Sequence, residues 1–88
     1  MAFLGQVVFY ADAKRYGFLR VYEGPPEPHV GDADVFVHLS DVMPHDRAGA
    51  PARLHRGEWV RFDVEMREMG EMGIRPRAQM VARVVPGA

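Results

Sequence analysis

Two short stretches of the sequence each place a pair of ring-bearing side chains two positions apart. The first carries Tyr16 and Phe18, and the second carries Phe36 and His38. Residues i and i+2 of a β-strand point to the same face, so each pair would lie on one side of a strand, opposite Leu or Val. Rings gathered on an outer face can stack on unpaired bases, because every base has a π-face. The spacing therefore predicts a surface suited to single-stranded nucleic acid.

The alternative is that these rings belong to the hydrophobic core, because aromatic side chains bury large areas. Against this, the same two strands already offer an inward face with a period of two, made of Gly17, Leu19, Val21, Val35 and Val37. If the rings pointed inward, these aliphatic side chains would face water. We therefore expect the rings outside. His38 alone would be a weak signal, and it gains weight from lying two residues after Phe36.

The elements that must position these rings are β-strands. Five stretches alternate in polarity or are rich in β-forming residues. They are residues 3–10, 16–22, 34–39, 58–67 and 77–85. In the fourth stretch, Val60, Phe62 and Val64 are expected to face inward. No amphipathic helix is evident, and at most a short turn begins at Ser40. Several short strands punctuated by Gly and Pro predict an all-β barrel or sandwich.

Three connections are long enough to form enlarged surface loops, at residues 23–33, 43–53 and 66–75. The first contains three Pro and two Gly between Glu23 and Asp32, so it cannot be a regular strand. The third contains methionines separated by glycines, which is typical of a hairpin tip, with an adaptable partner surface as the alternative. Trp59 is expected to point outward and cover an end of the barrel, the alternative being a further binding aromatic.

Composition limits the class of protein. With 88 residues, 48% of them hydrophobic, the chain is expected to form a single domain with one modest core. No apolar run approaches the ~20 residues of a membrane-spanning helix, and the start of the chain lacks the features of a signal peptide. We expect a cytoplasmic protein without membrane contact. The absence of Cys excludes disulfides, thiolate nucleophiles and Cys-based zinc sites.

Charge is close to balanced overall, with 11 Lys and Arg against 12 Asp and Glu. That balance argues against a strong binder of polyanions. Its distribution is uneven: residues 23–46 hold six carboxylates and no Lys or Arg, whereas residues 47–88 hold eight Arg and five carboxylates. Ten of the 11 cations are Arg, which can stack on bases as well as contact phosphate. The acidic loop 23–34 is a candidate docking segment for a basic protein partner.

Taken with further segments, the two ring-bearing motifs resemble a cold-shock domain. The resemblance is carried by residues 5–10, 14–19 and 34–40, and it continues in the segments 54–57, 60–64 and 76–78. It spans roughly the whole chain. It implies a five-stranded antiparallel OB-type barrel that binds single-stranded RNA or DNA without catalysing a reaction. The implied role is that of an RNA chaperone or a modulator of transcription or translation.

The resemblance adds three candidates to the four rings. Phe9 stands where the family usually has a base-stacking Trp, and we expect it to face outward with Tyr10 inward, although alternation does not decide between them. Lys14 matches a loop lysine that contacts phosphate; the alternative is a solvated turn lysine. Arg77 would lie near the binding face, or else be an ordinary exposed strand residue. The candidate interface therefore comprises Phe9, Lys14, Tyr16, Phe18, Phe36, His38 and Arg77.

The chain also departs from the family pattern. Leu39 stands at the position of a third aromatic residue, and Gln6 and Val8 stand where lysines are frequent. Each lost stack removes roughly 1–3 kcal/mol of binding free energy, so we expect a weaker binder than a typical family member, the alternative being that Arg20, Arg61 or Arg77 compensates. Arg15 replaces a usual Gly, and its backbone is therefore expected to avoid conformations that only Gly tolerates.

The residue types in the chain also bear on catalysis, metal binding and other modes of recognition. The chain has no Cys and a single Ser, Ser40, and it lacks a Gly-rich phosphate loop, so we expect no enzyme and no cofactor. The four His lack metal-ligand spacing, so no metal is expected. An RNA-recognition motif would need two helices and the opposite order of its aromatic motifs. An OB-type protein-interaction module with weak or no nucleic-acid binding stays open. A monomer is expected, with a weak dimer as the alternative.

Overall fold

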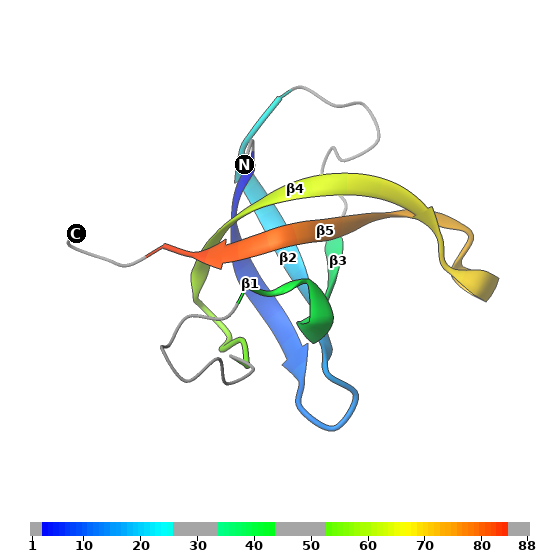
Figure 1. The fold of residues 1–88 in the computed structure, drawn as a ribbon, viewed down its shortest axis with the longest axis horizontal. Helices are drawn as coiled ribbons and strands as arrows, with labels where there is room; N and C mark the ends of the chain where they lie inside the picture. Colours follow the sequence, from blue (N-terminus) through cyan, green and yellow to red (C-terminus); the bar gives the residue numbers. More distant parts are fainter. Residues whose placement is uncertain (1–2, 26–33, 44–52, 85–88) are drawn as a thin grey trace.

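The described residues of the computed structural model, 3–25, 34–43 and 53–84, contain five β-strands and two short 3-10 turns (Figure 1). None of these residues lies in an α-helix. The elements, in chain order, are β1 (Phe3–Ala11), β2 (Tyr16–Glu23), β3 (Val35–His38), η1 (Leu39–Asp41), β4 (Trp59–Glu68), η2 (Gly70–Met72) and β5 (Ile74–Arg83). No helix within these ranges is long and apolar enough to cross a membrane.

The strands close into a barrel in the order β1-β2-β3-β5-β4, with β4 pairing again with β1. This confirms the predicted all-β, five-stranded barrel, and the topology is compatible with OB-like folds. One part of the prediction was wrong, because the barrel is not entirely antiparallel. β3 and β5 pair in parallel, with Phe36 opposite Arg77. A parallel pair requires a crossover, and the chain between β3 and β5 provides one by passing through β4.

The core fills the inside of this barrel. The predicted inward face is confirmed: Leu19, Val35 and Val37 are fully buried, and Val21 packs half-buried against them. β4 contributes the fully buried Phe62, whose ring lies 5.8 Å from that of Phe3. Among the described residues, the same core cluster also includes Val7, Leu54, Val60, Ala78 and Val81. Because the inside is already full of aliphatic side chains, the rings on the opposite faces of β2 and β3 are left outside.

A β-bulge in β1 decides which way Phe9 points. Val7 pairs with Leu19 but Phe9 pairs with Phe18, so Val8 is an extra residue on β1. A bulge of this kind interrupts the alternation of side chains. Val7 is consequently buried, whereas Phe9 is 47% exposed although it lies only two residues later. Tyr10 packs against the core, so the expected orientations of Phe9 and Tyr10 are both observed.

A close approach between β1 and β2 supports the same arrangement. Gly17 lies opposite Tyr10, and a Cβ atom at Gly17 would collide with the backbone oxygen of Phe9. Only a residue without a side chain allows this spacing. Gly17 therefore helps to bring Phe9 beside Phe18, the next residue along β2.

The β4–β5 hairpin is longer than predicted. Residues 66–75 were expected to form a loop, but β4 continues to Glu68 and β5 begins at Ile74. The turn is confined to residues 69–73, where Met69 N–H donates to the Gly73 carbonyl at 2.8 Å. Gly70 and Gly73 adopt φ of 60° and 74°, which favours glycine. The hairpin projects beyond the barrel (Figure 1). Most of the other two predicted loops, residues 26–33 and 44–52, lies outside the described residues.

Candidate nucleic-acid interface

Four rings from three neighbouring strands form one cluster on the outside of the barrel, here called the aromatic platform: Phe9 on β1, Tyr16 and Phe18 on β2, and Phe36 on β3. The strand register brings them together, because Phe18 lies opposite both Phe9 and Phe36. Ring centroids of Phe18 lie 6.2 Å from Phe9 and 5.9 Å from Phe36. Tyr16 and Phe36 are 5.4 Å apart. The sequence prediction that these rings share a face is confirmed.

The platform is held in shape by its own contacts. Phe18 meets Phe36 at 74° and Tyr16 at 80°, both edge-to-face. Aromatic pairs favour such angles at centroid separations of ~4.5–7 Å. Phe9 is nearly half exposed and the other three rings are partly exposed. The rings are thus exposed to solvent and already arranged without a ligand. This preorganisation lowers the entropic cost of binding.

His38 extends this face and also has a structural role. It lies opposite Tyr16 in the β2–β3 register and two residues beyond Phe36. Its Nδ1 accepts the Ser40 backbone N–H at 3.1 Å, which caps η1, and lies 2.9 Å from the Ser40 hydroxyl. An Nδ1 that accepts a backbone N–H leaves the proton of the neutral ring on Nε2. His38 therefore places a ring on the face expected for the interface and also holds η1 through its contacts with Ser40.

Arg77 lies beside the platform, but its charge is already paired. Its guanidinium carbon is 5.6 Å from the centroid of the Phe36 ring, a cation–π arrangement. Nε and Nη2 each lie 2.8 Å from Oδ2 of Asp41 in η1. The Arg77 side chain is only 18% exposed, so it is not an ordinary exposed strand residue. Its position near the face was expected; its ion pair with Asp41 had no signal in the sequence.

Lys14 occupies the turn between β1 and β2. It is exposed, two residues before Tyr16, and forms no ion pair with any residue that the structure describes. The neighbouring expectation for Arg15 was wrong. Arg15 adopts φ of 60°, in the left-handed region that favours glycine. The turn requires it, since Arg15 N–H donates to the Ala11 carbonyl at 2.8 Å while its own carbonyl accepts from Leu39 N–H at 2.8 Å.

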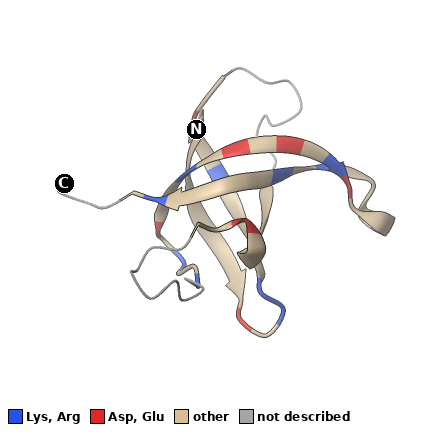
Figure 2. Ribbon diagram, viewed as in Figure 1, with Lys and Arg blue, Asp and Glu red and all other residues tan. Residues whose placement is uncertain are grey.

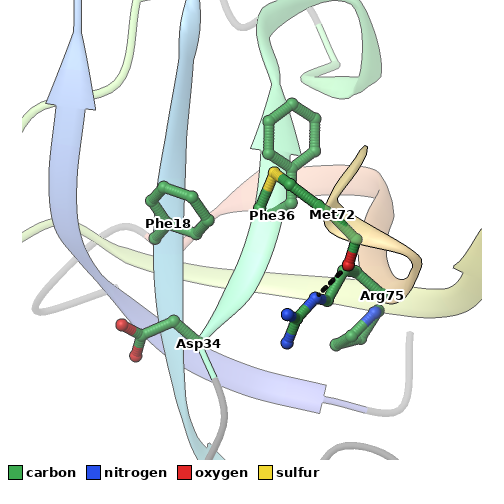
Figure 3. A pocket seen from close by; sticks show the side chains of 6 residues that line it. Phe18, Asp34, Phe36, Met72 and Arg75 are labelled. Carbon is green, nitrogen blue, oxygen red and sulfur yellow. Dashed lines mark hydrogen bonds between the residues drawn. The ribbon is translucent and has the colours of Figure 1, made fainter. Parts of the chain in front are cut away.

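A cavity of about 290 Å³ adjoins the platform. It is lined by Phe18, Asp34, Phe36, Met72, Arg75 and Pro76. Figure 3 shows Phe18 and Phe36 on adjacent strands, with Met72 and Arg75 reaching in from the hairpin. Arg75 Nε donates to the Met72 carbonyl at 2.8 Å, which fixes this side of the cavity. Two rings, a thioether, a guanidinium and a carboxylate could hold a planar base by its face and its edge. Sequence reasoning missed Asp34, Met72 and Arg75 as candidates.

Charge around the platform is sparse. Figure 2 marks charged residues along β4 and β5 and in the β1–β2 turn, whereas β1 and β3 contain no Lys, Arg, Asp or Glu. On β2 the charged residues are Arg20 and Glu23. Within the described ranges, no three His, Cys, Asp or Glu side chains are grouped so that they could hold a metal ion. The face offers stacking and hydrogen bonding more than a strong electrostatic field.

Comparison with known protein-family models finds no match for this chain, and comparison with curated protein sequences finds none either. The fold and the platform are therefore the observations that bear on function.

Proposed function

We propose that the protein binds single-stranded RNA or DNA by stacking unpaired bases on the aromatic platform, in the manner its resemblance to cold-shock domains implies. One observation carries the proposal: four rings of three adjacent strands lie together on the outside of a barrel whose inside is already full. Burial does not explain an outward cluster of this kind, and base stacking does. Such binding would keep strands unpaired without consuming a nucleotide, as an RNA chaperone does, and would need no catalytic group.

The affinity for single-stranded nucleic acid is expected to be moderate. Leu39 offers no ring, and the charge of Arg77 is engaged by Asp41. Stacking contributes roughly 1–3 kcal/mol per base, so a few stacked bases support binding without many phosphate contacts. Sub-nanomolar affinity at physiological salt would contradict this expectation.

The test is a titration of a labelled pyrimidine-rich oligonucleotide, followed by fluorescence anisotropy, with RNA and DNA versions of the same sequence. We expect Phe18→Ala and Phe36→Ala each to weaken binding by about 5- to 150-fold, as loss of one stack implies. Met80→Ala is the matched control, because Met80 is 57% exposed and lines a separate hollow with Ser40 and Val42. Equal affinity for all three variants and the unaltered protein would reject the platform as the binding surface.

A second candidate is an OB-type module that binds a protein. The net charge of −1 and the acidic segment 23–34 favour it. A partner held by that segment would be retained after Phe18→Ala and Phe36→Ala, whereas nucleic-acid binding through the platform would be lost. The same variants therefore separate the two functions.

A further inference from the structure

A second aromatic pair lies on the same outer surface as the platform. Tyr22 and Trp59 have ring centroids 4.7 Å apart at an angle of 61°. Tyr22 is 56% exposed, and Trp59 is half-buried. Along β2, Tyr16, Phe18 and Tyr22 occupy alternate positions of the outward face, with Arg20 completing the series. The expectation that Trp59 covers an end of the barrel would explain the position of Trp59. It would not explain why the Tyr22 ring beside it is exposed to solvent.

The surface between the platform and this pair is continuous. Gln6 on β1 lies opposite Arg20 on β2 and also opposite Trp59 on β4. These three residues therefore form a row across three neighbouring strands. A hollow of about 400 Å³ adjoins Gln6 and Arg20 of this row, and Val8 and Arg56, from the turn before β4, also line it. Residues from Phe18 to Tyr22 span about 13 Å at the usual rise of a β-strand.

The charges along this row suit a phosphate backbone. Arg20 and Arg56 are both exposed, and neither forms an ion pair with a residue of the described ranges. Arg77, on the other side of the platform, is paired with Asp41. Arg20 and Arg56 therefore place two cations, unpaired among the described residues, on the surface between the platform and the Tyr22–Trp59 pair. Arginine can also stack on a base that crosses the hollow.

We infer that a bound single strand continues from the platform along β2, with phosphates beside Arg20 and Arg56, and stacks a further base on the Tyr22–Trp59 pair. This inference rests on the proposed function and extends it to a longer binding site. Its consequence is a dependence on length: an oligonucleotide short enough for its bases to be used on the platform leaves the second pair empty, and a longer one covers both. Site sizes of roughly 4–16 nucleotides are usual for one OB-type fold.

The test compares oligo-dT of about 4 and about 10 nucleotides, lengths at the two ends of this range. We expect Tyr22→Ala to leave binding of the short oligomer unchanged and to weaken the long one about tenfold, in line with the loss of one stack. Tyr22→Phe, which keeps the ring, is the matched control and should bind both like the unaltered protein. Phe18→Ala should weaken both lengths. Circular dichroism confirms that each variant is folded.

Trp59 supplies an independent readout, because it is the only Trp in the sequence. Its fluorescence should be quenched by the long oligomer and left unchanged by the short one. The inference is overturned if Tyr22→Ala has no effect on the long oligomer while Phe18→Ala weakens it; the proposed function then survives. Absence of binding by the unaltered protein overturns both. If Tyr22→Ala instead abolishes self-association in sedimentation, with no effect on the long oligomer, the pair is a contact between copies and the inference is wrong.

Discussion

At the scale of single residues, side chains near the platform serve the fold and the surface together. Arg77 lies over the Phe36 ring and is held by Asp41 from η1, so one guanidinium supports the platform and ties the 3-10 turn to β5. His38 caps that same turn through Nδ1 and presents its ring beside Phe36. The edge of the platform is therefore fixed by polar contacts, and its cations are partly neutralised by them.

Asp41→Asn is expected to free the charge of Arg77 for phosphate. The affinity for an oligonucleotide should rise severalfold, and the salt dependence should steepen by about 0.7 in the slope of log K against log salt, as one added phosphate contact implies for a single strand. Glu68→Gln changes the net charge equally on the exposed end of β4 and is the control. Anisotropy titrations at several salt concentrations measure both slopes. An unchanged slope for Asp41→Asn would show that Arg77 does not meet phosphate even when released.

Arg15→Gly is expected to stabilise the protein. A residue with a side chain in the left-handed region costs roughly 1–2 kcal/mol, and the greater freedom of Gly in the unfolded chain offsets part of that gain. The free energy of unfolding should therefore rise by about 0.5–1 kcal/mol. Ala13→Gly in the same turn is the control. Ala13 has no positive φ to relieve, so this change should lower the free energy of unfolding. Urea titrations of both variants and the unaltered protein measure this free energy. A lower unfolding midpoint for Arg15→Gly than for the unaltered protein would contradict the strain at this position.

At the scale of elements, the β4–β5 hairpin does more than connect two strands. Its turn places Met72 and Arg75 against the cavity beside Phe18 and Phe36 (Figure 3). The long strands allow this, since β4 continues to Glu68 and β5 starts at Ile74. The hairpin thus supplies one wall of the hollow that adjoins the platform.

Arg75→Ala should weaken oligonucleotide binding about fivefold while leaving the melting temperature nearly unchanged, because Arg75 is exposed and contributes a cationic wall rather than core packing. Arg67→Ala removes the same charge from β4, where Arg67 pairs with Glu65 at 2.9 Å outside the cavity. Anisotropy and thermal melts of the two variants form the comparison. Equal losses of affinity would point to net charge, and not to the cavity, as the cause.

At the scale of the whole molecule, a filled barrel carries an apolar outer face with few free cations. The exposed cations near that face without an ion pair to the described residues are Lys14, Arg15, Arg20, Arg56 and Arg75. Three to five phosphate contacts on a single strand imply a slope of about −2 to −3.5 in log K against log salt. Filter binding at several salt concentrations measures it. A slope steeper than about −5 would require many more phosphate contacts than this surface offers.

The partial burial of Tyr10 is expected to make the stability of the barrel depend on pH in the alkaline range. Burial raises the pKa of Tyr10, and the nearby charge of Asp12 raises it further. The neutral phenol is therefore favoured in the folded state, so its contribution to stability is complete below about pH 10 and is lost as the pH rises through the folded pKa. Tyr10→Phe should remove this part of the alkaline loss, as urea titrations at pH 8 and about pH 11 would show. An identical alkaline loss in both proteins would assign it to other groups.

The features that depend on local alternation could be predicted from the amino-acid sequence. The period of two on β2 and β3 fixed which side chains fill the core and left Tyr16, Phe18, Phe36 and His38 on the opposite face. These strands and the inward face of β4 were predicted because the pattern repeats within each segment and needs no knowledge of its neighbours.

Contacts between segments far apart in the chain became evident only once the barrel was seen to close. The bulge at Val8 turned Phe9 outward, the parallel pairing of β3 with β5 brought Arg77 over Phe36, and the hairpin carried Met72 to the platform. The same holds for the meeting of Tyr22 with Trp59. Register across strands follows from barrel closure and pairing, which local alternation does not encode. The platform's centre could thus be predicted from sequence, whereas its charge balance and its extent are set by the closed barrel.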